Sequence, residues 1–291
     1  MEKQLLHADG PLFSRIVAGA WRWHTISSEQ VEKLIHTALD QGITTFDHAD
    51  IYGDHSNEEV FGNILRRNPS LRTKMELVTK CGIKFQSGKR PASRVKHYDT
   101  SKDHILWSAE NSLRMLGTDT LDLLLIHRPD PLMNPEEIAE GFTKLRTQGK
   151  VKHVGVSNFT PSQFSMLQSY LPFPLVTNQI EISLSRLDPL FNGELDVLME
   201  LRVSPMAWSP LGGGKSIAVD EREVFQMAAR YNCSYSQLSL AWLMKHPAGI
   251  LPIIGTTKPE RVEEAAGAMS VDLNRQDWFE LLKWVMGKEV P

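Results

Sequence analysis

Four side chains that could act together on a carbonyl group stand at or just after the ends of short apolar runs. Asp47, Lys80 and His127 each close such a run, and Tyr52 follows Asp47 by five positions. An isolated charge in apolar surroundings is costly, so each of these groups must lie at an opening or be paired. Any one of them alone could be a solvated loop charge or half of a structural ion pair. Three consecutive apolar runs that each end in an ionisable residue favour one shared site.

The tyrosine is the group that could transfer a proton. A free phenol has a pKa of about 10, and a neighbouring ammonium group lowers that value. Lys80 can supply the positive charge, Asp47 can hold Lys80 charged and in place, and His127 can orient a carbonyl oxygen by donating a hydrogen bond. These roles for Tyr52 and its neighbours suit general-acid reduction of a carbonyl. Because no side chain supplies a hydride, a nicotinamide cofactor is implied.

The elements that would position these residues alternate between apolar, β-rich runs and helical patterns, as successive βαβ units do. Eight units with right-handed crossovers can close into a barrel, whereas an open doubly wound sheet would show a G-x-G-x-x-G fingerprint after its first strand. No such fingerprint is present. We therefore predict an α/β fold, a (β/α)8 TIM barrel. Its strands are Arg15–Gly19, Thr44–His48, Glu76–Lys80, Leu121–His127, Val151–Val156, Leu175–Ile180, Ser204–Trp208 and Ile250–Ile254.

Helix start signals stand between the predicted strands. Ser27 and Gln30 have the spacing of a capping box, as do Thr160 and Gln163, and Asn134 precedes a proline. Two helical segments exceed the eight units.

The two helical segments beyond the eight units are one of the pair within Glu221–Lys245, and Arg275–Met286. We expect extra helices and a C-terminal tail over the barrel, with the tail from Trp284 to Pro291 helping to shape a substrate pocket. No linker interrupts the sequence, so residues 1–291 are predicted to form a single domain.

Composition limits the classes of function. The chain has 291 residues, 41% apolar and 23% charged, as in ordinary globular proteins. Its net charge of −3, with scattered Lys and Arg, argues against a nucleic-acid partner. Two cysteines are too few for a disulfide framework, and no run reaches the ~18 apolar residues that span a membrane. We expect a cytoplasmic protein without a membrane or nucleic-acid partner, and the oligomeric state stays open.

Two motifs resemble the aldo-keto reductase superfamily. Residues 46–53, Phe-Asp-His-Ala-Asp-Ile-Tyr-Gly, are similar to the segment of that family joining its catalytic Asp and Tyr, and Leu123–Pro129 resembles its fourth-strand histidine motif. The likeness extends over nearly the whole chain and points to the bacterial oxidoreductases of the family. It implies an NADPH-dependent enzyme that reduces aldehydes or ketones to alcohols, with Tyr52 as the proton donor and Lys80, Asp47 and His127 completing a tetrad.

The resemblance also implies residues for the nicotinamide half of NADPH. Ser157, Asn158 and Gln179 match side chains that hold the carboxamide, and Trp208 matches the aromatic residue that stacks on the ring. The loop after Trp208 matches the one that covers the pyrophosphate. That loop supplies Ser209, Pro210, Leu211 and Gly212.

For the adenosine half, Ile254–Arg261 resembles the segment that receives the 2′-phosphate. Lys258, Arg261 and a capping signal from Thr257 to Glu260 could bind that group. The same resemblance assigns cofactor contacts to Gly255, Thr256 and Thr257, and places Glu264 near the adenine. Many relatives have Lys where Gly255 stands and Asn where Ala265 stands. A preference for NADPH therefore depends on Lys258 and Arg261.

Trp21 matches an aromatic residue of the substrate pocket in many relatives. Trp23 lies close enough to make this alignment ambiguous, and packing beneath the N-terminal loops is an equal alternative for Trp21.

Two further alternatives concern different classes of site. Gly212–Ser216 resembles part of a phosphate-binding loop, but Ser209 stands where the first glycine of that motif is required. Five histidines between His48 and His127 lack the spacings of a metal hydrolase, and we expect most of them on the surface or in loops.

The rival that shares every motif is a barrel that binds NADPH as a redox sensor or accessory subunit, with little turnover. An intact tetrad favours catalysis.

Overall fold

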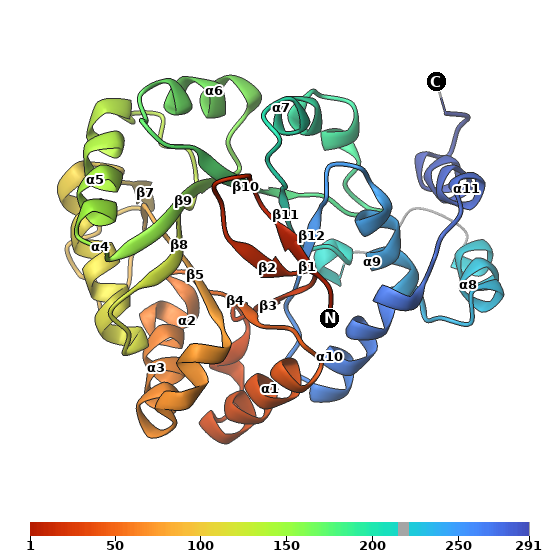
Figure 1. The fold of residues 1–291 in the computed structure, drawn as a ribbon, viewed down its shortest axis with the longest axis horizontal. Helices are drawn as coiled ribbons and strands as arrows, with labels where there is room; N and C mark the ends of the chain where they lie inside the picture. Colours follow the sequence, from red (N-terminus) through yellow and green to blue (C-terminus); the bar gives the residue numbers. More distant parts are fainter. Residues whose placement is uncertain (215–220, 291) are drawn as a thin grey trace.

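Eight short parallel strands form the centre of the structure, a computed structural model that describes residues 1–214 and 221–290. They pair in a closed ring in the order β10-β11-β12-β3-β4-β5-β8-β9, with helices arranged around it (Figure 1). The strands are β3 (Val17–Gly19), β4 (Thr45–Asp47), β5 (Glu76–Cys81), β8 (Leu121–Ile126), β9 (Val151–Ser157), β10 (Leu175–Glu181), β11 (Met206–Trp208) and β12 (Leu251–Ile254). The predicted barrel is confirmed, and each predicted strand end lies within two residues of the observed one.

The helices pack outside the strands and return the chain to the same end of the barrel each time, as right-handed crossovers require. They are α1 (Ser28–Asp40), α2 (Tyr52–His55), α3 (Asn57–Arg67), α4 (Lys102–Leu116), α5 (Pro135–Thr147), α6 (Pro161–Ser169), α7 (Glu194–Glu200), α8 (Glu221–Arg230), α9 (Tyr235–Lys245), α10 (Pro259–Ala266) and α11 (Arg275–Met286). None of them, within the part of the chain that is described, is long and apolar enough to cross a membrane.

Three helices begin at the capping residues that the sequence predicts. Ser27 with Gln30, and Thr160 with Gln163, each form a complete capping box, and the Asn134 side chain accepts a hydrogen bond at the start of α5. Each cap satisfies backbone N–H groups that the first helical turn leaves without partners. The local sequence therefore specifies where α1, α5 and α6 begin.

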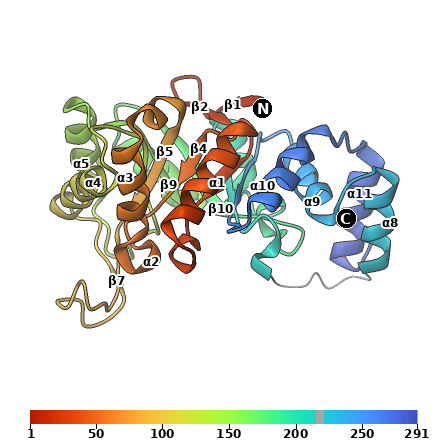
Figure 2. The same cartoon turned by 90° about the horizontal axis from the view of Figure 1, so that it is seen from below.

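The core has two layers, one inside the ring of strands and one between the strands and the helices around them. Inside the ring, strand side chains pack with Leu6 and Phe13, both fully buried. These two belong to an antiparallel N-terminal hairpin of β1 (Lys3–Leu5) and β2 (Leu12–Ser14). In Figure 2 the hairpin lies at one end of the barrel and α2 lies at the other. The hairpin thus closes the end where the strands begin and leaves the end where they finish free for chemistry.

The extra helices lie to one side of the barrel. The indole rings of Trp242 in α9 and Trp278 in α11 stack with centroids 4.8 Å apart, and each ring N–H donates to the other residue's carbonyl. Tyr231 and Arg230, at the end of α8, contact Asp277. α8 and α11 confirm the expected extra helices. The chain end after α11 lies beside α8 rather than across the mouth (Figure 2), so residues 284–290 do not roof the catalytic end. The cause is the anchoring of α11 on α9 by the two tryptophans. Pro291 is outside the described residues.

Candidate active site

A buried ion pair joins two neighbouring strands at the mouth. Lys80, near the end of β5, places its Nζ 2.7 Å from Asp47 Oδ2 at the end of β4, and the two side chains are 0% and 3% exposed. Nζ also donates to the His48 carbonyl at 2.8 Å and to the Tyr52 hydroxyl at 3.1 Å. All three ammonium protons therefore have partners. Burial lowers the Lys80 pKa, but the charge of Asp47 and the contact with Tyr52 outweigh it and raise the pKa.

Tyr52 begins α2, directly above this ion pair. Its ring meets that of His127 edge to face with centroids 5.9 Å apart, and Lys80 Nζ lies 4.9 Å from its centroid. The short helix is bent, because Gly53, Asp54 and His55 all have positive φ, at 59°, 51° and 63°. Two of these three are not glycines, and such backbone is strained and is often found at functional sites. This turn directly follows Tyr52, whose hydroxyl lies 3.1 Å from Lys80 Nζ.

The pKa of Tyr52 differs from our expectation. Burial penalises the phenolate and raises this pKa, Lys80 lowers it, and the charge of Asp47 raises it again. The net direction is upward, so the prediction that Lys80 and Asp47 together lower the pKa is wrong in this respect, although the effect of Lys80 alone has the expected sign. The consequence suits a general acid, since Tyr52 carries its proton at neutral pH.

His127 follows β8 and faces the same space. Burial first, then the positive charges of Lys80, Arg128 and Lys96, hold its pKa well below the usual range. The ring is therefore neutral, with one N–H to donate. Nδ1 is buried without a partner among the described residues, which favours the tautomer with the proton on Nε2. In that state His127 can donate to a carbonyl oxygen beside the phenol.

The residues expected to hold the nicotinamide form one hydrogen-bonded network on the next strands. Ser157 Oγ donates to the Gln179 carbonyl, and Asn158 Nδ2 donates to Ser157 Oγ at 2.7 Å and to the His127 carbonyl at 3.3 Å. Trp208 Nε1 donates to Asn158 Oδ1 at 2.9 Å. Asn158 has a φ of 62°, which points its side chain back into this network. The structure brings all four predicted residues together beside Asp47 and His127.

The loop after Trp208 is a tight turn. Ser209 has a φ of 50° and its carbonyl accepts from the Gly212 N–H at 2.9 Å. Gly212 has a φ of 72°, and a Cβ there would lie 2.5 Å from Ser185 Oγ, so only glycine fits. Pro210 and Leu211 lie between them, buried and half-buried. Lys215 and Ser216, the distinctive part of the phosphate-loop alternative, lie outside the described residues.

The segment expected to bind the 2′-phosphate begins α10. Lys258 and Arg261 are exposed, and neither has an ion-pair partner among the residues that the structure describes. The predicted Thr257–Glu260 cap is not formed: the N-cap residue is Lys258, without a side-chain cap. The reason is Pro259, which sets the first helical position and keeps the preceding residue extended. Gly255 has open space where a Cβ would stand.

The neighbours of this segment are held by other contacts. The Thr256 hydroxyl accepts from the Lys258 N–H at 3.1 Å. Glu264 accepts from Ser234, the N-cap of α9. Its carboxylate therefore has one structural partner already, and Thr256 fixes the turn into the helix.

The two N-terminal tryptophans have different places. Trp23 is 4% exposed, stacks on Phe61 and donates its ring N–H to the Thr256 carbonyl at 3.3 Å. Trp21 is 55% exposed, after the end of β3. The core alternative considered for Trp21 is therefore wrong, because Trp23 fills that position. Trp21 is free to contact a ligand at the mouth.

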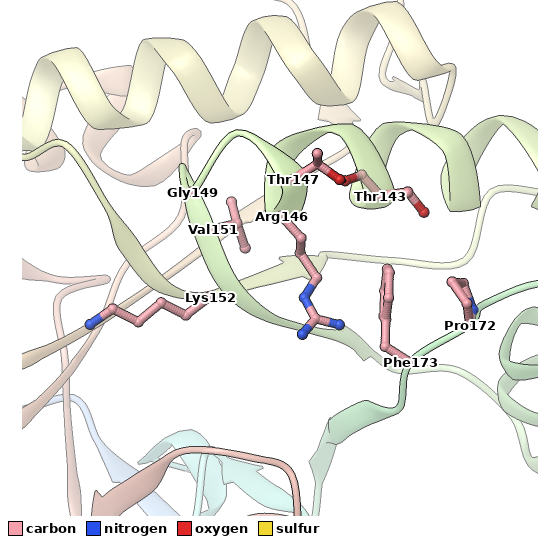
Figure 3. Close-up of a pocket in the computed structure, with 8 residues that line it drawn as sticks. All are labelled: Thr143, Arg146, Thr147, Gly149, Val151, Lys152, Pro172 and Phe173. Atoms are coloured by element: carbon pink, nitrogen blue, oxygen red, sulfur yellow. The ribbon is translucent and has the colours of Figure 1, made fainter.

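A cavity elsewhere does not compete with this site. About 650 Å³ of space lies against Arg146 and Phe173, whose side chains approach one another in Figure 3. Val151, where β9 begins, lines it. It therefore opens at the opposite end of the strand from Ser157, away from Tyr52.

Comparison with known proteins decides the family. The sequence model of the Aldo/keto reductase family matches residues 15–284. The chain belongs to this family. A 6-dehydroglucose reductase of Agrobacterium fabrum is 49% identical over 284 residues, which cover 95% of this chain and 96% of the relative.

Two solved aldo/keto reductase structures share the fold of this enzyme. The thermostable Tm1743, in complex with the inhibitor epalrestat, has a TM-score of 0.86 and 26% identity, covering 98% of this chain and all of the other. An enzyme of Klebsiella pneumoniae, in complex with NADP and acetate, has a TM-score of 0.79 and 25% identity over 97% of this chain and 94% of its own.

Sequence reasoning missed several groups around the site of this aldo/keto reductase. His48 lies in the loop after β4, but it is fully buried beneath the mouth rather than on the surface, and burial and Lys80 lower its pKa to about 3. Asp50 and Glu58 are also buried. Arg128 lies half-buried beside His127. The signal available for Arg128 was its place at the end of an apolar strand. Among the described residues, no cluster of His, Cys, Asp and Glu could hold a metal ion.

Proposed function

We propose that this aldo/keto reductase uses NADPH to reduce the carbonyl group of a small aldehyde or ketone to an alcohol, with Tyr52 as the general acid. The observation that carries the proposal is the Tyr52 hydroxyl, held 3.1 Å from a buried, ion-paired Lys80 at the open end of the barrel. The Klebsiella structure, which contains NADP, and the reductase from Agrobacterium support the same reaction class.

The chain's own residues fit NADPH. Around Trp208 a flat aromatic face lies next to amide and hydroxyl groups, which suits a nicotinamide ring and its carboxamide. Gly255 leaves room for close approach, and the exposed Lys258 and Arg261 can pair with a 2′-phosphate. Bound there, NADPH supplies the hydride that no side chain can provide.

The protein's part is to bind the carbonyl oxygen and protonate it. The neutral His127 donates a hydrogen bond to that oxygen, and the Tyr52 Oη–H bond breaks as the proton moves to it. Lys80 stabilises the phenolate left behind, because its ammonium lies within hydrogen-bond reach of Oη. Asp47 keeps the lysine charged throughout.

The test is a panel of aldehydes and ketones, assayed for NADPH oxidation with the wild-type enzyme and Tyr52→Phe. General-acid catalysis is worth about 10²–10⁴-fold, so the variant should lose turnover on that scale while binding NADPH normally. Near-normal turnover in Tyr52→Phe would remove Tyr52 from this role. Tight NADPH binding with no turnover of any carbonyl would favour the sensor or accessory subunit instead.

A further inference from the structure

Arg128, at the mouth of the barrel, has no ion-pair partner among the residues that the structure describes. It follows His127 directly, is half-buried, and holds its Cζ 5.4 Å from the centre of the Trp208 ring. No described residue forms an ion pair or a hydrogen bond with its guanidinium group. By contrast, Arg15 donates to two backbone carbonyls, and Arg72 pairs with Asp122. Charges that are partly withdrawn from water are normally paired, so Arg128 is available for an anion that enters this space.

A basic loop reinforces this cation. Residues 85–96 join β6 (Ile83–Lys84) to β7 (His97–Tyr98) and contain four cations and no acidic residue: Lys89, Arg90, Arg94 and Lys96. The loop contacts the catalytic turn, since Phe85 stacks on His55 at 5.2 Å and Ser87 donates to Asp54. Figure 2 shows this loop projecting beside α2. The charges of Lys96 and Arg128 both reach His127 and lower its pKa.

These cations lie on the substrate's side of the site. The barrel order places β4, β5 and β8 as consecutive neighbours, and these strands supply Asp47, Lys80 and, just after β8, His127. The residues proposed for the nicotinamide lie in or just after β9, β10 and β11, beginning with the strand that adjoins β8, whereas Lys258 and Arg261 follow β12, which lies opposite β8 in the ring. Arg128 follows β8 and the basic loop follows β5. The 2′-phosphate of the cofactor therefore has Lys258 and Arg261 on its own side, and Arg128 lies across the ring from them, next to His127.

We propose that Arg128, aided by Lys96, binds an oxyanion on the substrate, so that the enzyme prefers carbonyl compounds that carry a carboxylate, sulfonate or phosphate group. This rests on the proposed function. A planar guanidinium offers two parallel N–H donors that match such groups, and its face contact with Trp208 fixes the orientation of the fork. The basic loop adds a positive field at the mouth of a protein whose net charge is −3, and such a field attracts anionic ligands.

The experiment compares 4-carboxybenzaldehyde with its neutral methyl ester at saturating NADPH. We expect the wild-type enzyme to favour the anion in kcat/KM, and Arg128→Met to reduce that preference by about 10- to 100-fold, mainly through KM, as the loss of a charge-assisted hydrogen bond implies. The matched control is Arg275→Met. That arginine also lies 5.4 Å from an aromatic ring, that of Phe279, but in α11, far from the mouth. The control should keep the full preference.

A second readout works without turnover. Binding of 4-(hydroxymethyl)benzoate, the alcohol product, to the NADP-loaded enzyme should weaken in Arg128→Met by a similar factor, and less so in Lys96→Met. Loss of carbonyl turnover with this binding difference intact would count against the proposed function and support the anion site. Equal kcat/KM for acid and ester in the wild type, or equal product binding by wild type and Arg128→Met, would overturn the inference. A weaker affinity for NADPH with an unchanged preference would also overturn it, and would assign Arg128 to the cofactor.

Discussion

Gln179 Nε2 donates a hydrogen bond of 2.9 Å to Asp47 Oδ1, while the other oxygen of Asp47 accepts from Lys80. The same carboxylate therefore holds the Lys80 ammonium, proposed to act in catalysis, on one side and a proposed nicotinamide-binding amide on the other. Both residues are buried. This hydrogen bond is one direct link between the two halves of the site, and the two partners of Asp47 can be tested by separate substitutions.

Asp47→Asn should impair both halves. The variant leaves the Lys80 ammonium buried with neutral acceptors only, and breaking a buried pair costs about 3–5 kcal/mol of stability. Without the Asp47 charge, burial lowers the Lys80 pKa, so kcat should fall, and fall most at alkaline pH. Gln179→Leu removes only the amide and should raise the KM for NADPH while costing about 1.5–3 kcal/mol of stability, because the lost hydrogen bond is to a buried carboxylate. Urea unfolding and kcat–pH profiles of both variants are the measurements. A Gln179→Leu enzyme with reduced kcat and unchanged KM would contradict this division.

Lys258→Met should weaken NADPH binding by about 10- to 100-fold and leave NADH binding nearly unchanged, since a charge-assisted bond to the 2′-phosphate is worth about 1.5–3 kcal/mol. Lys258 is exposed at the start of α10, so the substitution should not affect stability. The control is Lys144→Met, an equally exposed lysine on α5. Titration calorimetry with both cofactors gives the comparison. Equal losses for NADPH and NADH would assign Lys258 a structural role.

Much of this architecture could be predicted from the sequence because local chemistry specifies it. Eight apolar runs with helical segments between them give the barrel, and pairs such as Ser27 with Gln30 set helix starts. The tetrad was visible because ionisable residues end apolar strands. The N-terminal hairpin was not visible, since its strands have three residues each and its stability depends on burying Leu6 and Phe13 inside a barrel formed by distant segments.

Properties of the site that depend on burial could not be predicted. The sign of the Tyr52 pKa shift depends on how completely the fold removes the phenol from water, which outweighs the adjacent Lys80. Whether Trp21 or Trp23 enters the core depends on Phe61, more than 35 residues away. Likewise, the contact of Arg128 with Trp208, and its lack of an ion-pair partner among the described residues, depend on surroundings that only the folded chain creates.

Trp208→Phe separates stacking from hydrogen bonding in the cofactor site. Phenylalanine keeps an aromatic face but leaves Asn158 Oδ1 without its 2.9 Å donor, so we expect NADPH affinity to fall by about fivefold, equivalent to about 1 kcal/mol. Trp208→Ala should lose more, because the ring itself is removed. Calorimetry with NADPH measures both. If the two variants bind NADPH equally well, the ring does not stack on the nicotinamide.

Glu58 makes stability depend on pH. It is 3% exposed, and its carboxyl group accepts hydrogen bonds from Thr79 Oγ1 at 2.6 Å and from Ser112 Oγ at 3.0 Å. Burial raises its pKa to about 7, whereas the ordinary value is 4.5. Between those two values the folded chain binds more protons than the unfolded one, so the free energy of unfolding falls as pH rises through this window. The full effect is about 3 kcal/mol at 1.36 kcal/mol per unit.

Glu58→Gln should remove this slope, because glutamine is neutral at every pH; its Oε1 can accept from one of the Thr79 and Ser112 hydroxyls, and its Nε2 can donate to the other. Relative to wild type, the variant should therefore gain stability between about pH 5 and pH 8, as measured by urea unfolding across that range. Asp50→Asn should also gain stability relative to wild type as pH rises. Its gain should extend to a higher pH, because burial raises the Asp50 pKa to about 8. A difference between wild type and Glu58→Gln that does not change with pH would mean that Glu58 is ionised in the folded chain, with Thr79 and Ser112 donating to a carboxylate.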